Sequence, residues 1–186
     1  MDNSILKEKI NQAVEILKEK NIDFILKVFK QLCKTDNKSH LVIVGKGPES
    51  DNLLSLAKKL GVLERVHFTG AIEYEFMPLV YKDAEVFVFA SYTETQGMCI
   101  LEASASGIPI VANNDSAFEG MVEDKKSGYF LPLNIEKFAQ ELNYLLQNDN
   151  IRTKMGEEAV KIASRNFDSG KITKNLVNIY LNARKS

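Results

Sequence analysis

The sequence predicts a doubly wound α/β domain with a Rossmann-like parallel sheet. Strand-like and helix-like segments alternate along the chain from about Ile22 onward. The strand-like segments, such as Leu41–Val44, are unbroken apolar runs, which are typical of parallel strands buried on both faces. A regular alternation of such strands with helices favours one parallel sheet with helices on both of its faces.

The individual elements follow from local patterns. A helix is predicted at 24–32, where apolar residues share one helical face, and another at 53–60, which Gly61 ends. Short apolar runs predict the strands, at 41–44, 66–68, 86–89, 108–112 and 129–131. Helical patterns predict the remaining helices, at 77–81, 99–106, 134–146, 151–167 and 171–183.

Residues 6–20 also have a helical pattern, because Ile10, Ala13, Val14 and Leu17 fall on one face. We therefore expect an atypical N-terminal helical segment at 1–20. The domain itself is expected at 21–186, with the C-terminal helices included.

Length and composition limit the classes of protein. The 186 residues suffice for one domain with a substantial core, and 45% hydrophobic with 26% charged residues is typical of a soluble globular domain. A net charge of −1 gives no sign of a nucleic-acid surface. The longest apolar runs are too short for a membrane span, and no signal peptide is visible. Cys33 and Cys99 lack motif spacing, which favours a reducing, cytoplasmic setting.

Residues 91–103 (SYTETQGMCILEA) carry the most information about function. Glu94 lies in a predicted loop, Gly97 stands where a helix should begin, and Glu102 lies on that helix. The start of a helix has unpaired N–H groups and a positive dipole end, so it can hold a phosphate. Carboxylates beside a phosphate are better suited to hydroxyl groups than to the anion. Phosphate and hydroxyl groups together indicate a nucleotide sugar.

Glu94 and Glu102 also form the E-x7-E motif, and its surroundings resemble the family-four retaining glycosyltransferases with the B-type fold. Four further family phrases occur in the expected order, at 19–24, 41–48, 65–70 and 127–132. The resemblance runs from about Glu19 to the C-terminus. It implies the C-terminal, donor-binding half of that two-domain fold.

The resemblance also implies roles for particular residues. Glu94 becomes the catalytic acid that binds hydroxyls of the donor sugar, and Glu102 binds those of the ribose. The backbone N–H groups of the helix start and one lysine would hold the diphosphate. The residues concerned are Gly97, Met98, Cys99 and Lys20.

Two turns after strands would complete the donor cleft. Gly45 and Gly47 lie along the cleft, and the backbone of Ala71 and Ile72 reads the base. Ser50 stands in the third glycine position of a dinucleotide fingerprint, which argues against a nicotinamide site.

Each of these residues also has a structural interpretation. Glu94 could cap the helix or interact with its dipole, Gly97 could be a turn residue, and Lys20 could be a surface lysine. His40 and His67 have no metal-ligand spacing and are expected to be structural. No metal or other cofactor is expected.

The N-terminus departs from the family pattern. Val14, Glu15 and Ile16 stand where relatives carry Gly-Arg-Leu at the end of a strand, so the first strand is expected to be missing or rewritten. Glu15 replaces an arginine that would help to hold the diphosphate. The family's N-terminal acceptor domain is also not recognised, so we expect a donor half, either excised or naturally isolated.

The expected function is donor binding in a retaining hexosyltransferase that uses a nucleoside diphosphate sugar, with uridine as the expected base. The chain alone is expected to transfer nothing. Thr95 and Gln96 resemble members that glycosylate lipids such as diacylglycerol, which would place the parent enzyme at the inner membrane face. The alternatives are a non-catalytic nucleotide-sugar-binding module and an inactive remnant.

Overall fold

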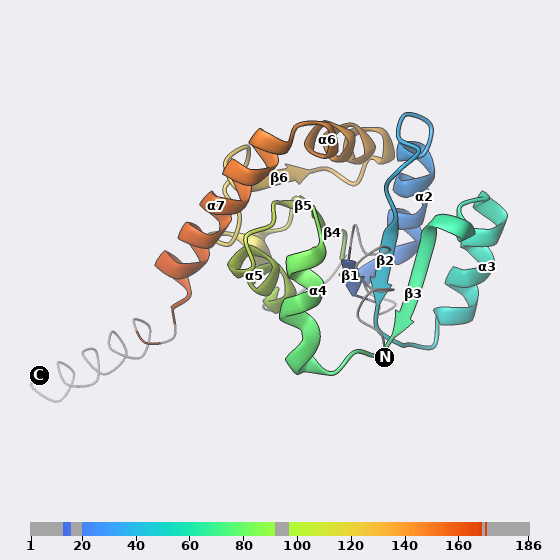
Figure 1. Cartoon of the computed structure of the whole chain (residues 1–186), viewed down its shortest axis with the longest axis horizontal. Coiled ribbons are helices and arrows are strands. Elements are labelled where there is room, and N and C mark those ends of the chain that lie inside the picture. The colour runs from blue at the N-terminus through green and yellow to red at the C-terminus, as the bar shows by residue number, and fades with distance from the viewer. Residues whose placement is uncertain (1–12, 16–19, 92–96, 169, 171–186) are drawn as a thin grey trace, which may run out of the picture.

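The computed structural model of the protein describes residues 13–15, 20–91, 97–168 and 170 (Figure 1). In this part the strands form two three-stranded parallel sheets, ordered β1-β2-β3 and β4-β5-β6. Strands β1 and β4 lie side by side, so the spatial order is β3-β2-β1-β4-β5-β6. This is the strand order of a doubly wound nucleotide-binding domain. The strands are β1 (Ala13–Glu15), β2 (Leu41–Val44), β3 (Val66–Gly70), β4 (Phe87–Phe89), β5 (Ile110–Asn113) and β6 (Gly128–Leu131).

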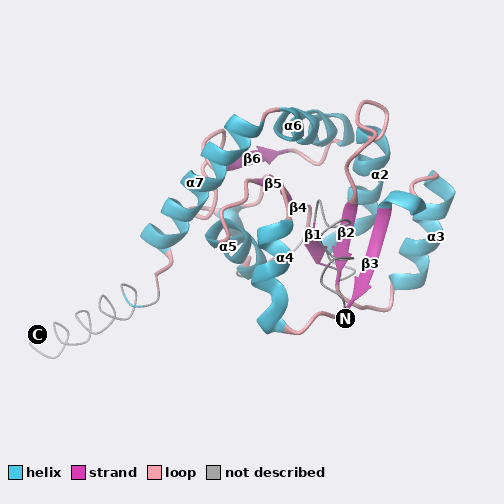
Figure 2. Ribbon diagram, viewed as in Figure 1, coloured by secondary structure: helices cyan, strands magenta, loops and turns pink. Residues whose placement is uncertain are grey.

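Helices connect the strands and cover both faces of the sheets (Figure 2). The α-helices are α2 (Ile22–Leu32), α3 (Ser50–Leu60), α4 (Met77–Asp83), α5 (Met98–Ala105), α6 (Ile135–Gln147) and α7 (Asp149–Asn166). Short 3-10 helices, which the sequence did not predict, lie in connections within the described residues: η2 (Leu63–Arg65), η3 (Tyr74–Phe76) and η4 (Ser116–Phe118).

Alternate residues of each strand enter two different hydrophobic cores. In β2, Ile43 joins the core beneath α2, α3 and α6, whereas Val42 and Val44 join the core beneath α4 and α5. In β4, Val88 faces the first core and Phe87 the second. The unbroken apolar runs therefore have the predicted cause, because both faces of these strands are buried.

Helix ends also follow local sequence. Gly61 ends α3 in the left-handed conformation, with φ of 70°, as predicted. Asn134 begins α6 by accepting a hydrogen bond from the Lys137 N–H at 2.9 Å.

The helix prediction for residues 6–20 is wrong at Ala13–Glu15, which form strand β1. Ala13, Val14 and Glu15 pair in parallel with Val42, Ile43 and Val44 of β2. A short apolar pattern suits a strand as well as a helix, and pairing with the sheet decides between them. The first strand is therefore present in rewritten form. Residues 6–12 and 16–19, and the helix predicted at 171–183, lie outside the described residues, and the division of the chain at residue 20 stays a prediction.

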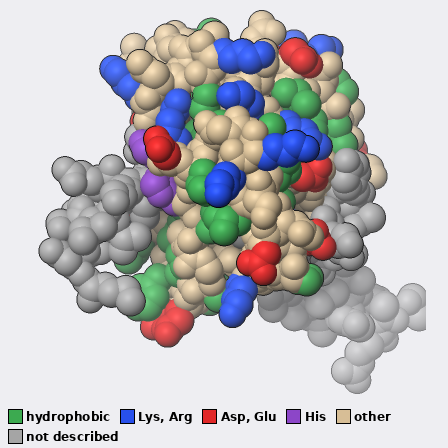
Figure 3. All heavy atoms as spheres, turned by 90° about the vertical axis from the view of Figure 1, so that its right-hand side faces the viewer, with side chains coloured by type: hydrophobic (Ala, Val, Ile, Leu, Met, Phe, Trp, Pro, Cys, Tyr) green, Lys and Arg blue, Asp and Glu red, His purple; other side chains and the backbone are tan. Residues whose placement is uncertain are grey.

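The surface carries both signs of charge. Figure 3 shows Lys and Arg side chains interspersed with Asp and Glu on the face that includes α3. Over the described ranges, none of the helices combines the length and the apolar character needed to cross a bilayer.

Candidate functional site

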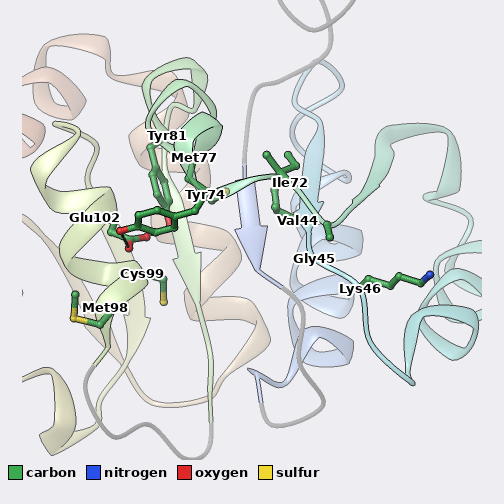
Figure 4. Close-up of a pocket in the computed structure, with 11 residues that line it drawn as sticks. Val44, Gly45, Lys46, Ile72, Tyr74, Met77, Tyr81, Met98, Cys99 and Glu102 are labelled. Carbon is green, nitrogen blue, oxygen red and sulfur yellow. Dashed lines mark hydrogen bonds between the residues drawn. The ribbon is translucent and has the colours of Figure 1, made fainter. Parts of the chain in front are cut away.

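A cavity of about 370 Å³ lies at the carboxyl ends of β2 and β3, facing α4 and α5 (Figure 4). In open α/β sheets this edge is where ligands bind. Most of the residues that the sequence predicted for the donor cleft line this cavity: Gly45, Ala71, Ile72, Met98, Cys99 and Glu102. The other lining residues were not predicted: Val44, Lys46, Tyr74, Met77 and Tyr81.

Two glycines shape the wall that β2 and β3 contribute. Gly45 has φ of 125° and Gly70 has φ of 71°, and both values favour glycine. The Gly45 N–H donates to the Gly70 carbonyl at 2.9 Å, which ties the ends of β2 and β3 together. The chain then leaves Gly70 toward Ala71 and Ile72, so both lie at the cavity.

Gly47 does not line the cavity. Its N–H donates to Ser50 Oγ at 3.1 Å, and Ser50 Oγ donates to the Gly47 carbonyl at 2.7 Å. Ser50 therefore closes the turn and begins α3. This contact explains why the turn lacks a third glycine.

The start of α5 forms the opposite wall. Gly97 is buried and adopts φ of 56°, and as the N-cap residue it has no side chain to cap the helix. The helical bonds begin with the Ile100 N–H, which donates to the Gly97 carbonyl at 2.9 Å. The N–H groups of Gly97, Met98 and Cys99 thus precede the helical ladder, as at any helix start. The first turn of α5 has no acidic residue that would interact with the positive end of the helix dipole.

Glu102 is held by two tyrosines that the sequence reasoning missed. Tyr74 OH donates to Glu102 Oε1 at 2.9 Å, and Tyr81 OH donates to Oε2 at 3.0 Å. The hydrogen bond to Glu102, with the charge of that carboxylate, raises the pKa of Tyr74 above its ordinary value. The two tyrosines are seven positions apart, about two helical turns, and this spacing was the available signal.

Lys20 lies near the same edge of the sheet but does not line the cavity. Its ammonium is 5.0 Å from the centroid of the Phe89 ring, a cation–π distance. Phe89 packs edge-on against Phe118, with ring centroids 5.4 Å apart. A Cβ added at Gly97 would lie 3.3 Å from the Phe118 ring, so Phe89 and Phe118 lie between Lys20 and the start of α5.

Glu94 lies outside the described residues, and its role stays a prediction. The residue just before that segment, Ser91, is fully buried. Its carbonyl accepts a hydrogen bond from Asn113 Nδ2 at 2.8 Å, which fixes where the segment leaves β4.

The histidines and possible metal ligands lie elsewhere or do not cluster. His40 Nδ1 and His67 Nε2 are 2.8 Å apart, where β2 and β3 begin, at the edge opposite the cavity. Within the described ranges no three His, Cys, Asp or Glu side chains are grouped so that they could hold a metal ion.

Comparisons with known proteins identify the family of this chain. The family model "Glycosyl transferases group 1" matches residues 7–162. Alpha-monoglucosyldiacylglycerol synthase of Acholeplasma laidlawii is 30% identical over 169 residues, which are 91% of this chain and 42% of that protein. The protein of the same name from Streptococcus pneumoniae is 38% identical over 110 residues, 59% of this chain and 25% of its own length. The chain thus spans less than half of the length of these relatives.

Solved structures show the same fold. A Staphylococcus aureus TarM mutant in complex with fondaparinux, alpha-GlcNAc-glycerol and UDP has a TM-score of 0.86 at 24% identity, over 94% of this chain and 36% of that one. Anabaena HepE in complex with UDP and glucose has a TM-score of 0.85 at 19% identity, over 97% of this chain and 50% of that one. The predicted fold class is confirmed. The chain belongs to the group 1 glycosyl transferases and has the α/β fold of one half of a B-type glycosyltransferase.

Proposed function

We propose that the cavity binds a nucleoside diphosphate sugar, with UDP-hexose as the donor, for retaining hexosyl transfer. One observation carries the proposal. Glu102 and the start of α5 lie on one side of the cavity, and the turns after β2 and β3 lie on the other. The carboxylate suits hydroxyl groups and the helix start suits phosphate, and a nucleotide sugar presents both kinds of group.

The walls of the cavity suggest an order for the parts of the donor. Ala71 and Ile72 offer backbone groups and apolar surface to the base, and Glu102 accepts hydrogen bonds from the ribose. The N–H groups of Gly97, Met98 and Cys99 receive the diphosphate. Glu94 would then reach the hexose, which continues beyond the phosphates.

The chemistry of the proposed transfer needs stabilised charge on the leaving diphosphate. Helix N–H groups aimed at that position act most strongly as the bond to the sugar breaks, because the negative charge grows there. Lys20 supplies a point charge at the same edge of the sheet. We propose that these groups act without a metal ion.

A lipid acceptor is proposed for the whole enzyme, because the Acholeplasma relative is a diacylglycerol-modifying synthase by name and Thr95-Gln96 resembles such members. The acceptor would sit on an N-terminal domain, and the enzyme would act at the inner membrane face.

One observation favours the alternative of a non-catalytic binding module. Glu15 ends β1 where the family carries an arginine for the diphosphate.

Calorimetric titration with UDP tests the binding proposal. UDP at a hundredfold excess over its dissociation constant should stabilise the folded protein by about 2.7 kcal/mol. Glu102→Gln should weaken UDP binding by roughly 1.5–3 kcal/mol, because a charge-assisted hydrogen bond is lost.

Glu157→Gln is the matched control, since Glu157 is exposed on α7 and does not line the cavity. It should bind UDP like the unchanged protein. A panel of uridine, guanosine and adenosine diphosphates in which none raises the melting temperature would overturn the proposal.

A further inference from the structure

The two tyrosines on Glu102 differ in how firmly they are held. Tyr81 is 3% exposed, lies on α4 and packs edge-on against Phe87, with ring centroids 5.8 Å apart. Tyr74 is 73% exposed and lies on the three-residue helix η3. Figure 4 shows the Tyr74 side chain reaching across the cavity to Glu102. Tyr81 is fixed by its packing, whereas Tyr74 can leave at little cost in buried surface.

The tyrosines occupy the carboxylate that the proposed ligand needs. Each oxygen of Glu102 already accepts one phenolic hydrogen bond, at 2.9 Å from Tyr74 and 3.0 Å from Tyr81. A carboxylate accepts only about four hydrogen bonds, and their directions are limited. Tyr74 approaches from the exposed side of the cavity, so a ligand hydroxyl on Oε1 must compete with it.

We propose that Tyr74 competes with the ligand, because its hydroxyl holds, in the free protein, the place on Glu102 that a ribose hydroxyl takes in the complex. Tyr81 is a positioning residue that keeps the carboxylate turned into the cavity by holding Oε2. The inference rests on the proposed function and assigns the selectivity of that site. A ligand with one hydroxyl only exchanges one hydrogen bond for another. A ligand with two neighbouring hydroxyls gains a bond on displacing Tyr74, so the site favours a ribose over a 2′-deoxyribose.

Tyr74→Phe and Tyr81→Phe each remove one hydrogen bond to Glu102, but they should change UDP binding in opposite directions. Tyr74→Phe keeps the ring and removes the competing hydroxyl, so the dissociation constant for UDP should fall about three- to tenfold, as expected when a blocked state is removed. Tyr81→Phe frees Oε2 and lets the carboxylate turn, so UDP should bind about tenfold more weakly. The preference for UDP over 2′-deoxy-UDP should also shrink in Tyr81→Phe. A general loss of stability would not change that ratio.

Isothermal titration of the 186-residue protein with UDP and 2′-deoxy-UDP is the test. Tyr144→Phe is the control, because Tyr144 is exposed on α6 and does not line the cavity. In the Glu102→Gln background, Tyr74→Phe should no longer tighten binding. If the unchanged protein binds UDP but Tyr74→Phe binds it equally or more weakly, this inference is wrong and the proposed function stands. If the unchanged protein binds no nucleoside diphosphate, both are wrong.

Discussion

Gly97 shows how one residue sets the geometry of the site. It begins α5 with φ of 56°, a conformation that costs an ordinary L-residue about 1–2 kcal/mol. A Cβ at this position would also lie 3.1 Å from Met121 Sδ and 3.3 Å from the Phe118 ring. Glycine is therefore required here for two reasons, conformation and space.

We expect Gly97→Ala to destabilise the protein by more than the conformational cost alone, and to weaken UDP binding because the helix start shifts. Gly61→Ala is the matched control, since Gly61 has φ of 70° and nothing within 4 Å of an added Cβ. Urea unfolding of both variants separates strain from crowding. Equal losses of stability would show that the space around Gly97 does not matter.

The sequence predicted residues whose position depends on local structure. Gly97, Met98 and Cys99 follow from a strand, a loop and a helix start that are contiguous in the chain. Tyr74 and Tyr81 were missed because their role depends on α4 packing beside α5, a contact between segments more than twenty residues apart. The sequence shows the spacing of the two tyrosines, but only the structure shows that both of them contact Glu102.

At the scale of elements, Arg65 links the loop between α2 and β2 to the start of β3 through hydrogen bonds. Its Nη2 donates to Asp36 Oδ2 at 3.1 Å and to the Ser39 carbonyl at 2.6 Å. Its guanidinium also lies 5.4 Å from the centroid of the Phe29 ring on α2. One side chain, on η2 just before β3, thus joins α2 and the loop that follows it to the start of β3.

This junction should make stability depend on acid pH. Burial by itself raises the pKa of Asp36, but hydrogen bonds from Ser39 and the Lys38 backbone, together with the Arg65 charge, lower it below its ordinary 3.8. The ionised form is favoured in the folded state, so the stabilisation is complete above pH 3.8 and is lost as pH falls through the lowered pKa.

Asp36→Asn should therefore lower the melting temperature at neutral pH and flatten its decline below about pH 4. Asp83→Asn, at an exposed position on α4, should keep the decline of the unchanged protein. Thermal unfolding followed by circular dichroism between pH 2 and pH 7 checks this. An unchanged acid decline in Asp36→Asn would contradict it.

Strand β1 marks where sequence reasoning failed at this scale. The strand-like runs at 41–44 and 86–89 were assigned correctly because every residue of β2 and β4 is apolar. Ala13–Glu15 is only three residues long and contains a charge, so its pairing with β2 decides its conformation. The local pattern of apolar residues cannot reveal this pairing, because β2 lies far away in the sequence.

At the scale of the whole molecule, the described residues are proposed to supply one wall of a reaction site. Glycosyl transfer requires that the acceptor be aligned with the donor and that water be kept out. The chain spans 42% of the length of the Acholeplasma relative, so the parent enzyme is proposed to supply the second wall from further sequence.

We expect the 186-residue chain to bind UDP-glucose without transferring glucose to diacylglycerol or to carbohydrate acceptors. Adding a matching N-terminal half in trans should restore transfer if the two halves dock. Radiolabelled transfer, measured against the rate of hydrolysis to glucose, checks both statements. Sustained transfer by the chain alone would contradict the half-enzyme proposal.

One wall of the cavity, with Gly45 and Ala71, follows strands of the first sheet, and the other, with Cys99 and Glu102, lies on α5, which connects β4 and β5 of the second sheet. A nucleotide bound as proposed would span the boundary between β1 and β4 and brace the two sheets against each other. Because a ligand that binds only the assembled state shifts the equilibrium toward it, occupancy should suppress partial opening of the two sheets. The persistence of this protein against proteases in the cell would then follow the supply of its own substrate.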